Sequence, residues 1–68
     1  MNIVEILKEA KEQGFKFAKD NADTWEIDNL IEEILQNEED NKEYFLRDGY
    51  ICESVNGFEG NKIYDLSK

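Results

Sequence analysis

The sequence predicts an α+β fold in which two helices pack on one face of a three-stranded antiparallel sheet. The first half carries two apolar stripes with helical spacing, and the second half carries two hairpin dipeptides. The expected helices cover about residues 3–13 and 24–37, and the expected strands cover about 43–47, 50–55 and 58–66. With 68 residues, the chain is expected to form one small acidic domain with a single core.

The first helix is predicted by the apolar stripe over residues 3–10. Asn2 can cap its start, and Gly14 stands where a left-handed residue often ends a helix. The alternative is a helix that continues through Gly14 to about Lys19, at a cost of about 1 kcal/mol for the glycine relative to alanine. Residues 15–18 would otherwise form a short strand or an extended linker.

The second helix contains the most apolar stripe of the chain, and the rest of the fold is expected to pack on it. Asp23 and Glu26 have capping-box spacing, which predicts a helix start at about residue 24. Trp25 then stands in the first helical turn, and its truncation is expected to leave little folded protein. The stripe comprises Ile27, Leu30, Ile31, Ile34 and Leu35.

Two hairpin turns are predicted in the second half, at residues 48–49 (Asp-Gly) and 56–57 (Asn-Gly). They divide this half into the three strands of an antiparallel meander. A continuous helix over residues 38–47 is the alternative, because Asp40 and Glu43 also have capping-box spacing.

Side-chain alternation fails across the second hairpin, and a bulge at Gly60 restores it by placing Ile51 opposite Ile63. A register shift of one residue would exchange the two faces of the sheet. The face expected beneath the helices contains Leu46, Ile51, Val55, Phe58 and Ile63. The opposite face would be uncovered, and it contains Phe45, Tyr50, Cys52, Tyr64 and Leu66. An uncovered aromatic face of this kind predicts an interface, formed by Phe45, Tyr50, Tyr64 and Leu66.

The charge of the chain limits the partners that it can bind. Seventeen acidic and eight basic residues give a net charge of −9. Nucleic acid and anionic membranes should repel such a chain, and a basic protein surface should attract it. The chain has no histidine, and its single cysteine lies within a predicted strand. We therefore expect no catalytic residues, and no cofactor or metal, because the acidic loops lack the ligand pattern of a calcium loop.

The sequence also predicts a location. Its longest apolar run is too short to cross a bilayer, and its N-terminus lacks the pattern of a signal peptide. Together with the single thiol, these features predict a cytoplasmic protein.

Acidic residues concentrate on the polar face of the second helix and directly after it. Acids about 5–6 Å apart along a helix form a regular row of negative charge, comparable with a row of phosphates. The functional prediction is binding to a basic protein, such as a nucleic-acid-binding protein; the alternative is a solvated face that only keeps the protein soluble. The predicted binding residues are Glu32, Glu33, Glu38, Glu39 and Asp40.

As a class, this short, strongly acidic and proline-free chain resembles the small inhibitors that phages and mobile elements encode, among them anti-CRISPR proteins. The resemblance implies an inhibitor that mimics nucleic acid, and it transfers no functional residues. The alternative function is a structural or assembly protein that forms a homodimer through the aromatic sheet face. Salt distinguishes the two, because only charge-driven binding weakens steeply with ionic strength.

Overall fold

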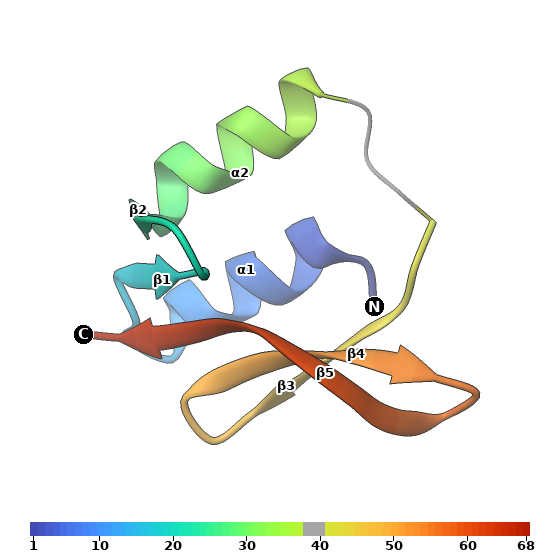
Figure 1. Ribbon diagram of the computed structural model, residues 1–68. Helices are drawn as coiled ribbons and strands as arrows, with labels where there is room; N and C mark the ends of the chain where they lie inside the picture. Colours follow the sequence, from blue (N-terminus) through green and yellow to red (C-terminus); the bar gives the residue numbers. More distant parts are fainter. Residues whose placement is uncertain (38–40) are drawn as a thin grey trace.

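The computed structural model describes residues 1–37 and 41–68, and this part of the chain forms two helices and a five-stranded antiparallel sheet (Figure 1). The helices are α1 (Ile3–Glu12) and α2 (Ile27–Gln36). The strands are β1 (Phe17–Lys19), β2 (Thr24–Glu26), β3 (Tyr44–Arg47), β4 (Tyr50–Val55) and β5 (Phe58–Ser67), in the spatial order β2-β1-β5-β4-β3. The α+β class is confirmed, but the predicted meander supplies only three of the five strands.

Helix α1 starts at the predicted residue, Ile3, and ends at Glu12, one residue before the predicted end. The Asn2 side chain accepts a hydrogen bond from the Glu5 N–H, and the Glu5 carboxylate accepts one from the Asn2 N–H, which makes a capping box. Gly14 has a φ of +98°, and the Phe15 N–H donates to the Ala10 carbonyl over 3.1 Å. The helix therefore ends in a Schellman motif, and it does not continue through Gly14.

Strands β1 and β2 form a hairpin that extends the sheet. Ala18 lies opposite Trp25 in this hairpin and opposite Leu66 in β5. Of the two predictions for residues 15–18, the short strand is confirmed in part, as β1 starts at Phe17. Trp25 belongs to β2, so the prediction that it stands in the first turn of a helix is wrong.

The predicted capping box at Asp23 and Glu26 does not form. Asp20 instead closes the β1–β2 turn, and its side chain accepts the N–H groups of Ala22 (2.8 Å) and Asp23 (2.7 Å). Helix α2 begins at Ile27, after an N-cap residue, Glu26, that makes no side-chain capping hydrogen bond. The reason is that the residues of β2 gain ladder pairing with β1, which a helix start at the same place would forfeit.

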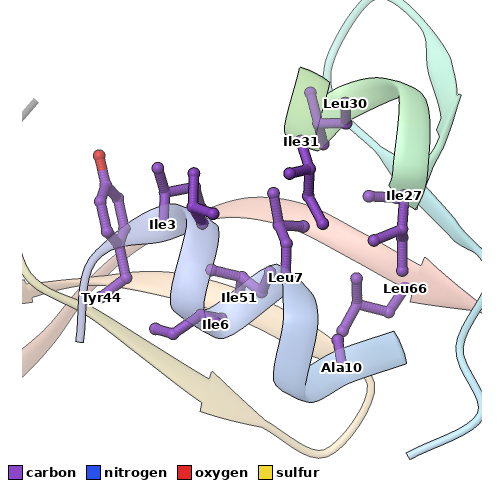
Figure 2. Packing of buried hydrophobic residues seen from close by; sticks show 12 residues of the cluster. Ile3, Ile6, Leu7, Ala10, Ile27, Leu30, Ile31, Tyr44, Ile51 and Leu66 are labelled. Atoms are coloured by element: carbon purple, nitrogen blue, oxygen red, sulfur yellow. The ribbon is translucent and has the colours of Figure 1, made fainter. Parts of the chain in front are cut away.

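Both helices lie on the same side of the sheet, as predicted, but in different ways. Helix α1 packs across the sheet, whereas α2 packs mainly on α1 and on the β1–β2 hairpin (Figure 1). Figure 2 shows Ile27 and Ile31 of α2 and Leu66 of β5 gathered around Leu7 of α1. Leu7 and Ile51 are fully buried, so one core holds the helices and the sheet together.

Two irregularities interrupt the pairing of β4 with β5, where the sequence predicted one. The first lies near Gly60, as predicted, and the second lies near Ile63. The second one places Ile51 opposite Tyr64 instead of Ile63. Because side chains alternate along a strand, this missed bulge moves Tyr64 and Leu66 to the helix side of the sheet. Leu66 is only 9% exposed, so the prediction that these two residues lie on an uncovered face is wrong.

At the tip of the β4–β5 hairpin, two residues that were predicted to be covered by the helices are exposed instead. Val55 and Phe58 were expected beneath the helices, yet they are 50% and 76% exposed. They form the last pair before the Asn56-Gly57 turn, which extends beyond the helices. Phe45 and Tyr50 lie on the outer face of the sheet, as predicted, and both are half-buried.

Candidate partner-binding groove

The predicted acidic face of α2 is divided between the two flanks of the helix. Glu32 and Glu33 are both exposed, but adjacent residues of a helix point about 100° apart. Glu32 borders a groove that it shares with Lys8 and Lys11 of α1, whereas Glu33 borders a groove that it shares with Trp25. The other three predicted binding residues lie outside the described residues: Glu38, Glu39 and Asp40.

On the flank of Glu32, acidic groups face basic ones. Lys11 forms an ion pair with Asp28, and Lys8 lines the same groove. Opposite charges this close together reduce the net negative potential that a partner would meet. This flank is therefore a weaker attractor of cations than the number of its acids suggests.

The flank of Glu33 has a different composition. A groove of about 320 Å³ lies there, between α2 and the sheet. Trp25 of β2, Tyr64 of β5 and Ile34 of α2 contribute apolar surface, and Tyr44 of β3 lines the groove together with Ile3. Figure 2 shows Tyr44 and Ile3 side by side at the edge of the core. The groove is thus an aromatic depression continuous with the core.

Asp20 supplies a fixed negative charge in this groove. Its carboxylate accepts a hydrogen bond from the Trp25 indole N–H over 3.2 Å, besides those from the two backbone groups of the turn. The N–H groups of Asp23 and Ala22, followed by the Trp25 indole, hold the pKa of Asp20 below its ordinary value. Burial, with a smaller contribution from the Asp20 charge, raises the pKa of Tyr64. At neutral pH the groove therefore contains an Asp20 anion beside a neutral Tyr64 hydroxyl.

Glu33 supplies the second acid of the groove. The side-chain amide of Asn37 donates to one Glu33 carboxylate oxygen over 3.0 Å and to the Glu33 carbonyl over 2.9 Å. Within residues 1–37 and 41–68, no hydrogen bond reaches the other carboxylate oxygen. A carboxylate can accept about four hydrogen bonds, so Glu33 keeps acceptor capacity for an external donor.

Among the described residues, neither a lysine nor an arginine lines this groove. A larger groove, of about 830 Å³ along β3, contains Arg47, which is ion-paired with Glu59. Three further grooves also contain basic side chains: Lys11 and Lys16, Lys42, and Lys8 and Lys11. The groove beside Glu33 therefore differs from these four in combining acids and aromatic rings without a lysine or arginine.

The outer face of the sheet carries a cluster that is already complete. The Arg47 guanidinium carbon lies 4.4 Å from the centroid of the Phe45 ring, and Arg47 is ion-paired with Glu59. The Tyr50 hydroxyl donates a long hydrogen bond of 3.5 Å to the same carboxylate. Cys52 is 1% exposed, and burial raises the pKa of its thiol. These contacts satisfy the outer face internally and leave the thiol poorly accessible.

The predicted aromatic interface does not form one surface, because the sheet separates its members into two pairs: Phe45 and Tyr50 outside, Tyr64 and Leu66 on the helix side. Of the exposed large apolar side chains, Val55 and Phe58 pair at the hairpin tip. Met1 and Leu35 are exposed elsewhere, so the prediction that Leu35 belongs to the packed stripe of the second helix is wrong. The Asn-Gly dipeptide was a signal for the hairpin tip, because residues that flank a tight turn lie at the end of a hairpin. No comparable local signal pointed to Asp20, Trp25 and Tyr64 as a group.

Comparison of the chain with protein-family models, with curated proteins and with solved structures gave no match. Within the described residues, no group of three or more Asp, Glu or Cys side chains is placed to hold a metal ion. Neither α1 nor α2 is long and apolar enough to cross a membrane. The geometry of the groove is therefore the basis for a functional assignment.

Proposed function

We propose that this protein is a non-enzymatic, acidic interaction module that binds a basic surface of another protein. The observation that carries the proposal is the groove beside Glu33, which holds two acids and aromatic rings but no lysine or arginine of the described chain. The net charge of −9 would accelerate association with a basic partner through long-range attraction. Glu32 on the other flank would contribute to this attraction more than to specific contact.

The biological role that we favour is inhibition of a nucleic-acid-binding protein, in the manner of the small acidic inhibitors of phages and mobile elements. What supports it is the net charge of −9 and the two acids, Asp20 and Glu33, that line the groove. The proposal places the protein in the cytoplasm, where such partners are found.

A labelled peptide with four arginines separated by glycines is a suitable basic probe. We expect the protein to bind it, with an affinity that falls steeply between low and high salt. The variant Glu32→Gln with Glu33→Gln should bind several-fold more weakly, because it removes two acids from α2. Its matched control is Asp48→Asn with Asp65→Asn, which removes the same charge elsewhere and keeps an Asn-Gly hairpin turn.

A version of the peptide with citrulline in place of arginine has nearly the same shape without the charge. Binding of the citrulline peptide as tightly as the arginine peptide would refute a charge-driven interaction. Equal losses in the α2 variant and in its control would show that net charge, and no particular surface, attracts the probe.

A second candidate function is self-association, and the exposure of Phe58 (76%) and Val55 (50%) at the hairpin tip favours it. In this case a homodimer would form through the tip and would persist at high salt. Sedimentation equilibrium of the wild type and of Phe58→Ser tests it. A wild-type protein that stays monomeric at high concentration would rule it out.

A further inference from the structure

The outer face of the sheet shows how this protein holds an arginine. The guanidinium of Arg47 lies over the Phe45 ring at 4.4 Å, and it is paired with the Glu59 carboxylate. The Tyr50 hydroxyl bonds the other oxygen of that carboxylate. The arrangement combines three favourable elements: an aromatic face for the cation, a carboxylate for its N–H groups, and a tyrosine that orients the carboxylate.

The groove beside α2 contains the same kinds of group without the cation. Trp25 and Tyr64 supply rings, and Asp20 and Glu33 supply carboxylates. The Trp25 indole orients Asp20 through a hydrogen bond of 3.2 Å, as Tyr50 orients Glu59 on the outer face. The three hydrogen bonds that Asp20 accepts leave it one further acceptor site, by the usual count of about four for a carboxylate.

We infer that this groove binds one arginine side chain of a basic protein partner, with its guanidinium against the aromatic wall, hydrogen-bonded to Glu33 and attracted by the Asp20 carboxylate. The inference rests on the proposed function, and it adds a single anchoring residue to a diffuse charge attraction. With about 320 Å³, the groove is at the lower end of the range for ligand sites, which suits one side chain better than a folded segment.

Arginine fits this groove better than lysine for two physical reasons. The guanidinium is planar and weakly hydrated, so it stacks on the rings of tryptophan and tyrosine at a low desolvation cost. Its five N–H groups can also reach two acceptors at once, whereas the lysine ammonium is a compact and strongly hydrated charge. The lining of the groove offers a partner for each property, because it contains aromatic rings for stacking and acids at two positions for the N–H groups.

The test uses a capped Gly-Gly-Arg-Gly-Gly peptide and the fluorescence of Trp25, which is the only tryptophan of the chain. We expect saturable binding of this peptide, and binding at least about tenfold weaker for the lysine and citrulline versions. Glu33→Gln should weaken arginine binding about five- to tenfold, because it removes one charged acceptor. Glu32→Gln, one residue away on the opposite flank, should stay within about twofold of the wild type.

Several outcomes would overturn the inference. Equal affinities for the arginine and lysine peptides, or equal effects of Glu33→Gln and Glu32→Gln, would contradict a slot for arginine. Binding of the four-arginine probe without any response to the single-arginine peptide would leave the proposed function standing and remove the slot. Failure of both probes would remove both. Glu33→Gln is preferred to a change at Asp20, because Asp20 also closes the β1–β2 turn.

Discussion

The two sides of the sheet carry similar residues in different electrostatic settings. On the outer face, Phe45 and Tyr50 accompany Glu59, and Arg47 neutralises this acid. On the helix side, Trp25 and Tyr64 accompany Asp20, and no lysine or arginine of the described chain lines the groove. An acid beside an aromatic ring is therefore a candidate binding site only where the chain does not supply its own cation. Counting acids along the sequence cannot make this distinction.

The largest expected effect is on stability, and it differs between the two sides of the sheet because only one of the two aromatic residues packs on the core. Trp25 packs against the core cluster, whereas Phe45 lies outside it. Trp25→Ala should lower the free energy of unfolding by about 3 kcal/mol, at the low end of the range for buried aromatics because Trp25 is half-buried. Phe45→Ala should cost about 1 kcal/mol, since it removes mainly surface contacts. Urea unfolding followed by circular dichroism measures both, and equal costs would contradict this view of the two sides.

The bulge near Gly60 helps determine which side chains of β5 point to each side of the sheet. A Cβ added at Gly60 would lie 2.8 Å from Val55 Cγ2 and 3.3 Å from Glu53 Cβ. Gly60→Ala should therefore destabilise the protein by about 1 kcal/mol, with part of the clash relieved because Val55 is exposed and can move. A melting temperature within error of the wild type would show that the bulge has room for a side chain.

Removal of Arg47 should convert the outer face into a copy of the open groove. Arg47→Gln should cost at most about 1 kcal/mol, because the ion pair with Glu59 is partly exposed. The vacated ring of Phe45 and the carboxylate of Glu59 should then accept the single-arginine peptide as a second, weaker site. Changes in the amide chemical shifts of β3 and β4 during titration with the peptide would report this site. Their absence would contradict the prediction that the two faces bind arginine in the same way.

The smallest expected effect is a shift in the pKa of Tyr64 when Asp20 is replaced. Burial, and then the charge of Asp20, raises the pKa of Tyr64 above its ordinary value of 10.0. Because its folded pKa exceeds its unfolded one, Tyr64 contributes stability that is fully present below pH 10 and is lost as the pH rises through the folded pKa. Asp20→Asn should lower the pKa of Tyr64 only in part, since burial is the larger cause. The ring signals of Tyr64 in NMR spectra, followed against pH, test this separately from Tyr50, whose pKa is also raised by burial. Ordinary titration of Tyr64 in the wild type would contradict it.

Local signals predicted the parts of the fold that depend on neighbours in the sequence. The cap at Asn2, the helix end at Gly14 and the two hairpin turns all appear in the structure. Each is determined within a few residues, by a side chain that meets nearby backbone groups or by a dipeptide that tolerates positive φ.

The strands that the sequence did not reveal depend on distant partners. Residues 24–26 satisfy a helix-start pattern, yet they form β2, because β1 offers them a pairing edge. Strand β1 is itself held in the sheet by β5, more than forty residues away. The bulge near Ile63 has no glycine to signal it, and missing it exchanged the faces of Tyr64 and Leu66. These pairings depend on the completed sheet, so no local pattern could predict them.

The candidate site was predicted only in its acidic component. Glu33 was expected to bind a partner together with Glu32. That the two residues border different grooves depends on the position of α1, which the sequence does not give. Asp20, Trp25 and Tyr64 come from a turn and from two strands that are not neighbours in the sheet. Their proximity is a consequence of the β1–β2 hairpin, whereas the sequence predicted a short strand or a linker over residues 15–18 and a helix start at about residue 24.

The most direct test of the central claim is a nuclear Overhauser experiment on the protein with the capped Gly-Gly-Arg-Gly-Gly peptide. We expect intermolecular contacts between the Cδ protons of the peptide arginine and the ring protons of both Trp25 and Tyr64. These contacts should weaken in Glu33→Gln and persist in Glu32→Gln. Contacts to Phe58 at the hairpin tip, or to Phe45 on the outer face, in place of Trp25 and Tyr64 would contradict the claim that the groove beside α2 binds the arginine.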